Sequence, residues 1–170
     1  ATTHGCILLA EKHIKPQGNA MIADIGAGSG ILAMVAATIN SSSRIIAVDN
    51  DPVAVAVMQE NVTHNNTADQ ITCSISDGYQ SAVVADHMPY DVIMANILPL
   101  PLIAMADDAA KALAEGGKII LSGLNVKHAE DVIAAHEAAG LSHVESLPIG
   151  DWMAVLMEKP RKSSGEGNHG

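Results

Sequence analysis

The sequence is organised around three glycines at alternate positions, Gly26, Gly28 and Gly30. They follow the short apolar run 21–25, which is typical of a buried strand, and precede the apolar, helix-like segment 31–37. Glycine permits positive φ and lets a ligand approach the backbone closely, and the amides that open a helix carry a partial positive charge. The stretch therefore predicts a strand, a loop that binds a nucleotide cofactor, and a helix. A purely structural glycine turn is the alternative interpretation.

The spacing around these glycines distinguishes between classes of cofactor. The dinucleotide fingerprint is G-x-G-x-x-G, and this chain has Ile31 where its third glycine would stand. Asp24, two residues before the first glycine, suits an amino group better than a pyrophosphate. Asp49 ends the next apolar run, at a distance where a carboxylate can bind both ribose hydroxyls of an adenosine. Adenosine and an amino acid without phosphate describe S-adenosylmethionine, which is the expected cofactor.

Apolar runs and turn signals alternate along the rest of the chain. We expect strands at 21–25, 45–48, 71–75, 90–96 and 118–122, and helices at 3–13, 31–39, 52–64, 102–113 and 127–139. No helix or strand is assigned to the segment that ends at Pro89, where the pattern is less regular. Two final strands at 143–149 and 152–158 flank Gly150 and Asp151, which predicts a closing hairpin.

This order predicts the fold class and the place of the site. Five strand-helix repeats and a terminal hairpin predict an α/β, Rossmann-like, seven-stranded and mostly parallel sheet, with helices on both faces and an antiparallel terminal hairpin strand. Ligands of such sheets bind at the carboxyl ends of the strands. Residues 24–30, Asp49, Asp77 and Asn96 all lie at predicted strand ends. We therefore expect four separate stretches to form one site.

Composition narrows the classes of partner. The net charge is −10 and aromatic residues make up 2% of the chain. A surface of this charge repels a polyanion, and stacking platforms for bases are scarce. We therefore expect no nucleic-acid partner, whereas a basic protein or a small cationic substrate fits the charge.

Two further features bear on location and metal binding. No apolar run approaches the ~18 residues that indicate a transmembrane helix, so no membrane association is expected. Cys6 and Cys73 lack the spacing of metal ligands and are typical of reduced core thiols. The eight histidines are scattered, and no metal site is predicted. We expect a cytoplasmic protein.

Several motifs together make the chain resemble class I methyltransferases, and within them the ribosomal protein L-eleven methyltransferase family, PrmA. The glycine loop is common to the superfamily, whereas 95–98 (Ala-Asn-Ile-Leu) and 121–123 (Leu-Ser-Gly) are more specific to this family. The resemblance extends over about residues 1–159. It also includes Thr2 and Thr3, residues 23–33 and 48–52, Asn61, Asn65, Asp151 and Trp152.

The resemblance implies roles for individual residues. Thr3 would contact the methionine carboxylate, Asp24 would help to hold the amino group, and the glycine loop would line the methionine and ribose. Asp49 would bind the ribose hydroxyls, Asn50 would flank the adenine, and Asp77 would accept from its exocyclic amine. Asn96 would lie beside the acceptor nitrogen and is the predicted catalytic residue. The predicted cofactor-binding set is Thr3, Asp24, Gly26, Ala27, Gly28, Gly30, Asp49, Asn50, Asp77 and Asn96.

The expected activity is methyl transfer from S-adenosylmethionine to an amine nitrogen, with a protein, possibly a ribosomal protein, as the substrate. The alternatives are a small-molecule amine methyltransferase, a non-catalytic interaction domain of the same fold, and an NAD-dependent oxidoreductase. We expect a methyltransferase domain over 1–159 and a disordered tail over 160–170. The family's Phe-Gly-Thr-Gly segment and N-terminal recognition domain have no counterpart in the sequence, which suggests a catalytic-domain fragment or a short relative with another target. The oligomeric state is left open.

Overall fold

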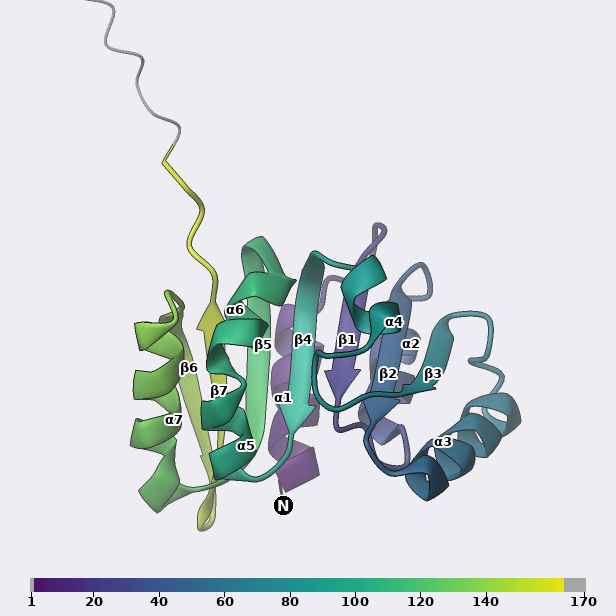
Figure 1. The fold of residues 1–170 in the computed structure, drawn as a ribbon, viewed down its shortest axis with the longest axis horizontal. Helices are drawn as coiled ribbons and strands as arrows, with labels where there is room; N and C mark the ends of the chain where they lie inside the picture. Colours follow the sequence, from purple (N-terminus) through teal and green to yellow (C-terminus); the bar gives the residue numbers. More distant parts are fainter. Residues whose placement is uncertain (1, 164–170) are drawn as a thin grey trace, which may run out of the picture.

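Seven strands form one sheet in the computed structural model, which describes residues 2–163. The strands are β1 (Met21–Ile25), β2 (Arg44–Asp49), β3 (Ile71–Ile75), β4 (Tyr90–Asn96), β5 (Leu113–Asn125), β6 (Ser142–Ile149) and β7 (Trp152–Glu158). Their order across the sheet is β3-β2-β1-β4-β5-β7-β6 (Figure 1). Across the sheet, the neighbouring strands β3, β2, β1, β4 and β5 pair in parallel. Strand β7 pairs antiparallel with both β5 and β6. The predicted fold class and its terminal hairpin are confirmed.

Helices cover both faces of this sheet. They are α1 (Thr2–His13), α2 (Ile31–Ile39), α3 (Pro52–His64), α4 (Ala82–Asp86), α5 (Pro99–Ala104), α6 (Ala106–Ala112) and α7 (Val126–Ala138). Successive residues of a strand point to opposite faces, so β2 contributes Ile46 to one apolar cluster and Ile45 to the other. The first cluster lies under α4 to α7, and the second lies under α1 to α3 (Figure 1).

The predicted helix 102–113 was wrong, because the structure has two helices there. They meet at Met105, whose N–H donates to the Pro101 carbonyl at the end of α5. The break places the Met105 side chain against Gly78, while Leu102 of α5 and Ala109 of α6 remain in the core. The apolar spacing predicted which residues face the core, and it did not indicate the break at Met105 between them.

The predicted strand 118–122 was too short at both ends. Its early part pairs with β4 through Leu113 and Tyr90, and a register shift then allows the turn at Gly116, where φ is +74°. Its late part continues because Leu124 pairs with Met153 of β7. The helix α4 was missed: it has only five residues, and it is capped by the preceding Ser81, whose hydroxyl accepts from the Val84 N–H.

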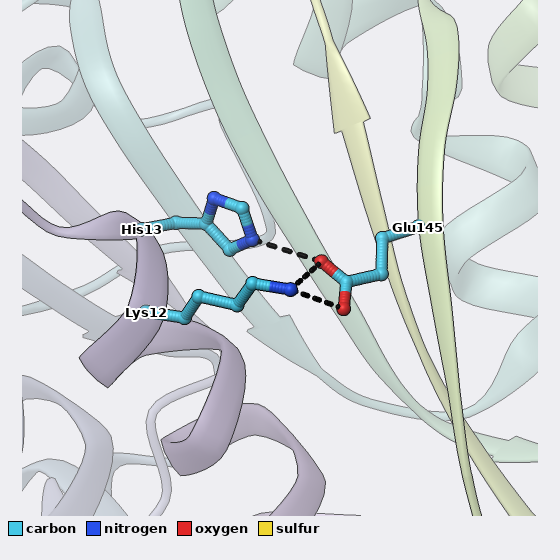
Figure 2. A network of polar contacts seen from close by, with 3 residues as sticks. All are labelled: Lys12, His13 and Glu145. Atoms are coloured by element: carbon cyan, nitrogen blue, oxygen red, sulfur yellow. Dashed lines mark hydrogen bonds and ion pairs between the residues drawn. The ribbon is translucent and has the colours of Figure 1, made fainter.

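An ion-pair cluster ties the last turn of α1 to β6 (Figure 2). Lys12 Nζ donates to both carboxylate oxygens of Glu145 at 2.8 and 2.9 Å, and His13 Nε2 lies 3.0 Å from Glu145 Oε2. The hydrogen bond from Lys12, followed by that from His13, lowers the pKa of Glu145. The cluster holds α1 across the sheet, and the first turn of this helix reaches the carboxyl ends of β4 and β5.

Two predictions about the ends and the membrane can be compared with the described residues. No helix within residues 2–163 is both long enough and apolar enough to span a membrane. Residues 160–163 form neither helix nor strand, and the remainder of the predicted tail, 164–170, lies outside the described residues. The division into a domain of 1–159 and a tail stays a prediction.

Candidate functional site

A cleft of about 610 Å³ opens at the carboxyl ends of β1 to β4. Four of the predicted site residues line it, Gly26, Asp49, Asn50 and Asp77. They come from three of the four stretches that were predicted to converge, whereas Asn96 of the fourth stretch does not line the cleft. Sequence reasoning missed further lining residues from the third and fourth strand ends, namely Ser76, Gln80, Ile97, Leu98, Pro101 and Met105.

Asp49 holds the glycine loop in place while its side chain forms part of the cleft wall. Its Oδ2 accepts from the Gly28 N–H at 2.9 Å, and its Oδ1 accepts from the Asp51 N–H at 3.0 Å. The Ala27 N–H donates to the carbonyl of Val48, one residue earlier on β2. The loop after β1 and the end of β2 thus form one hydrogen-bonded unit, with a half-buried carboxylate at the cleft.

The far side of the glycine loop is held by α3. Asn61 Nδ2 donates to the Ser29 carbonyl at 2.9 Å. At Gly30, where φ is +85°, a Cβ would lie 2.7 Å from the Cγ of Met58, a buried residue of the same helix. The glycine is required here for two reasons, the backbone conformation and the close approach of α3.

Asp24 lies beneath the loop and does not line the cleft. Its Oδ2 accepts from the Ala33 N–H in the first turn of α2 at 3.1 Å, which anchors the loop to the helix. Burial raises the pKa of this carboxyl to about 7 against the lowering effect of that hydrogen bond, and the charge of Asp49 raises it further. Its buried Oδ1 has no hydrogen-bond partner among residues 2–163. A buried carboxylate oxygen without a hydrogen-bond partner destabilises the folded state. Such an oxygen is characteristic of a site in which a bound ligand or a water molecule supplies the partner.

Asn96 at the end of β4 lies beside the first turn of α1. Its Nδ2 is 3.4 Å from the Thr3 Oγ1, so the structure brings these two predicted residues together on the sheet edge outside the cleft lining. The buried Ser122 of β5 donates to the Thr2 carbonyl at 2.7 Å. Through these contacts, β4 and β5 set the position of the threonines.

The third strand end shapes the other side of the cleft. The Ser76 N–H donates to the Asp49 carbonyl at 3.0 Å, and its hydroxyl donates to the Gly78 carbonyl at 2.7 Å. The Gln80 N–H donates to the Asp77 carbonyl, so Asp77 and Gly78 form a turn and at the same time line the cleft. The Ser76 hydroxyl also accepts from the Ser81 N–H at 3.2 Å, so its side chain supports the local turn, while its backbone N–H joins this turn to the end of β2.

The strand order with an antiparallel β7, and a glycine loop bonded to an acid at the end of β2, define the Rossmann-like fold of methyltransferases. The family model described as Ribosomal protein L11 methyltransferase (PrmA) matches residues 1–160, and the chain belongs to this family. The family assignment and the antiparallel hairpin of β6 and β7 do not support the alternative that this chain is an NAD-dependent oxidoreductase.

Relatives and solved structures agree with the family assignment. The chain is 36% identical to the ribosomal protein L11 methyltransferase of Rhizobium etli over 159 residues, which is 94% of this chain and 54% of the relative. With that of Brucella suis it shares 36% over 157 residues, 92% of this chain and 55% of the relative. The chain thus spans about half the length of these curated relatives.

Among solved structures, the ribosomal protein L11 methylase of Lactobacillus delbrueckii subsp. bulgaricus has a TM-score of 0.84 at 22% identity, covering 94% of this chain and 79% of that chain. The precorrin-6y C5,15-methyltransferase of Geobacter metallireducens has a TM-score of 0.76 at 15% identity, covering 91% and 87%. At these identities the likeness concerns the fold.

Proposed function

We propose that this chain is a methyltransferase domain that uses S-adenosylmethionine to methylate an amine nitrogen on a protein. The observation that carries the proposal is the half-buried Asp49 carboxylate, which accepts from the Gly28 N–H and lines the wall of the cleft. The names of the relatives, ribosomal protein L11 methyltransferases, support a ribosomal protein as the substrate.

The residues around the cleft fit this cofactor. A volume of about 610 Å³ falls in the range of small-molecule sites. Asp49 would bind the ribose hydroxyls, Asn50 would flank the adenine, and Asp77 would accept from the exocyclic amine. The glycine loop would contact the methionine and ribose, and Thr3 the methionine carboxylate. When bound, the cofactor supplies an electrophilic methyl group on a sulfonium.

The unpartnered Oδ1 of Asp24 adds to this fit. It lies under the loop that would carry the methionine moiety, and a carboxylate there favours a cationic amino group. Because Asp24 is buried and does not line the cleft, we propose that a water molecule bridges the two groups.

The chemistry at the acceptor needs alignment more than acid-base catalysis. Asn96 would accept an N–H of the neutral amine with its Oδ1, because its Nδ2 is turned toward Thr3. This contact would direct the nitrogen lone pair at the methyl group. Orientation of two reactants in this way can contribute about 7–11 kcal/mol to lowering a barrier in favourable cases.

Calorimetric titration with S-adenosylhomocysteine tests the proposal. We expect one-site binding to the wild type and a loss of about a hundredfold in affinity for Asp49→Ala, since a charge-assisted pair of hydrogen bonds is removed. Asp69→Asn is the matched control, because this exposed residue precedes β3 at the opposite edge of the sheet. Equal affinities for all three proteins, or no binding to the wild type, would contradict the proposal.

A further inference from the structure

An apolar groove of about 410 Å³ lies between α5 and α7, outside the cofactor cleft. Leu98, Leu100 and Ile103 contribute its apolar wall, and His128 and Asp131 contribute its polar wall. Leu100 is 79% exposed, the highest value among the large apolar side chains of residues 2–163, and Leu98 is 71% exposed, as is Val53 of α3. The core does not use these two leucines, so burial among residues 2–163 does not explain them.

The groove is rigidly built. Pro99 and Pro101 restrict the backbone at the start of α5, and Leu102 from the same helix is buried in the core. Proline at these positions lowers the conformational entropy that a flexible loop would lose on binding. The two leucines are thus held outward on an ordered segment.

The groove adjoins the cleft. Leu98 and Pro101 line both, so a ligand in the groove would lie beside the cofactor site. The segment also follows Asn96, the residue proposed to orient the acceptor amine. A molecule too large for the cleft alone could therefore extend from the acceptor position into the groove.

The charges of the combined surface favour a cation. Asp131 contributes a carboxylate to the groove, and no lysine or arginine of residues 2–163 lines the groove or the cleft beside it. The net charge of −10 acts in the same direction at longer range. The occupant is thus expected to combine a large apolar side chain with a basic one.

We propose that this groove binds the segment of the substrate polypeptide next to the methylated amine, and takes an aliphatic or aromatic side chain with a basic residue beside it. The inference rests on the proposed function, since it assigns a polypeptide acceptor to the same site. Leu98 and Leu100 supply the apolar contact, and Asp131 supplies the partner of the cation.

Titration of the ¹⁵N-labelled protein, saturated with S-adenosylhomocysteine, tests the groove by chemical-shift changes in NMR spectra. The probe is a short peptide with one leucine flanked by lysines. Matched peptides replace either the leucine by serine or the lysines by glutamate. We expect shifts at the amides of Leu100, Ile103 and Asp131 with the first peptide, and weaker binding of both replacements.

Substitutions locate the contact. Leu100→Ser is expected to weaken binding of the first peptide about tenfold, as for the loss of a buried leucine contact. Asp131→Asn should reduce the difference in affinity between the peptide with lysines and the peptide with glutamates. Val57→Ser, an exposed apolar position on α3, is the control and should leave peptide binding unchanged.

The outcomes separate this inference from the proposed function. Normal binding of S-adenosylhomocysteine with peptide shifts outside the groove, or equal binding of the leucine and serine peptides, would overturn the groove alone. Shifts of Leu98 and Leu100 that depend on protein concentration without peptide would also overturn it, because a second copy would then occupy the surface. Failure to bind S-adenosylhomocysteine would instead contradict the proposed function.

Discussion

The γ2 methyl group of Ile97 packs so close to Gly26 that it would collide with a Cβ atom at that position. The backbone of the same isoleucine lies against Gly123 of β5, whose missing side chain makes room for the Ile97 carbonyl. Ile97 therefore fits between two glycines from different strand ends. This contact joins the glycine loop after β1 to the segment after β4, and so fixes the cofactor side of the site relative to the acceptor side.

The first prediction follows from this contact. Gly26→Ala should lower the free energy of unfolding by about 3 kcal/mol, because the new methyl collides with Ile97 and the backbone has a φ of +71°. Gly28→Ala is the control: its φ is +56° but nothing lies within 4 Å, so only the backbone cost of about 1 kcal/mol applies. Urea unfolding measures both losses. Adding Ile97→Ala to the first variant should recover the collision component, and equal losses for the two glycine variants would contradict the packing argument.

The second prediction concerns the pH dependence of stability. Burial raises the pKa of Asp24 from 3.8 to about 7, so the folded protein binds this proton more tightly than the unfolded chain. Stability should therefore fall as pH rises from about 4 to about 7 and then level off. Asp24→Asn keeps an oxygen for the Ala33 N–H and cannot ionise, so the wild type should lose about 4 kcal/mol relative to the variant over that interval. Chemical denaturation at a series of pH values measures the free energy of unfolding of both proteins. If it changes with pH in the same way for the wild type and Asp24→Asn, the prediction is contradicted, because Asp24 is then already ionised at acidic pH.

The third prediction separates catalysis from cofactor binding. Asn96→Ala should lower kcat for methylation about a hundredfold, because the acceptor amine loses the group that orients it. Calorimetry should show that S-adenosylhomocysteine still binds. Thr3→Val is the companion variant: it removes the hydroxyl near Asn96 Nδ2, and we expect a smaller loss of kcat. Loss of cofactor binding together with activity in Asn96→Ala would show that the predicted contact of Asn96 with the cofactor, and not orientation of the amine, is its main role.

The fourth prediction concerns the cluster in Figure 2. Glu145→Gln should lower Tm at low ionic strength, since the carboxylate that holds Lys12 and His13 is lost. The lowered pKa of Glu145 means that its contribution is present above the ordinary glutamate value and is lost as pH falls. Calorimetry at high salt should show a smaller difference, because exposed charges are screened. Glu60→Gln, at an exposed position on α3, serves as the control. An equal drop in Tm for this variant would contradict the stabilising role of the cluster.

Local patterns were sufficient for much of the fold. Alternating or continuous apolar runs predicted the first four strands, and Asp51 followed by Pro52 predicted the start of α3, where the Asp51 carboxylate accepts from the Val53 N–H. These signals are short in range: a strand needs a period of two, and a helix start needs a cap. The elements that were wrong or missed depend on partners. The side chain of Met105, at the break between α5 and α6, lies against Gly78, and β5 is long because β4 and β7 pair with its ends.

The residues of the candidate site also fall into two groups, those that local patterns predict and those that depend on tertiary contacts. Local patterns in the sequence were enough to predict the fold class, the glycine loop, and the placement of Asp49, Asp77 and Asn96 at strand ends, because parallel strands that alternate with helices bring their carboxyl ends to one edge. Which side chains face the cleft and which support it depends on tertiary packing. Asp24 is buried beneath the loop, and Ile97 lies between Gly26 and Gly123. Such contacts join residues far apart in the chain, and they depend on close packing, which no local pattern encodes.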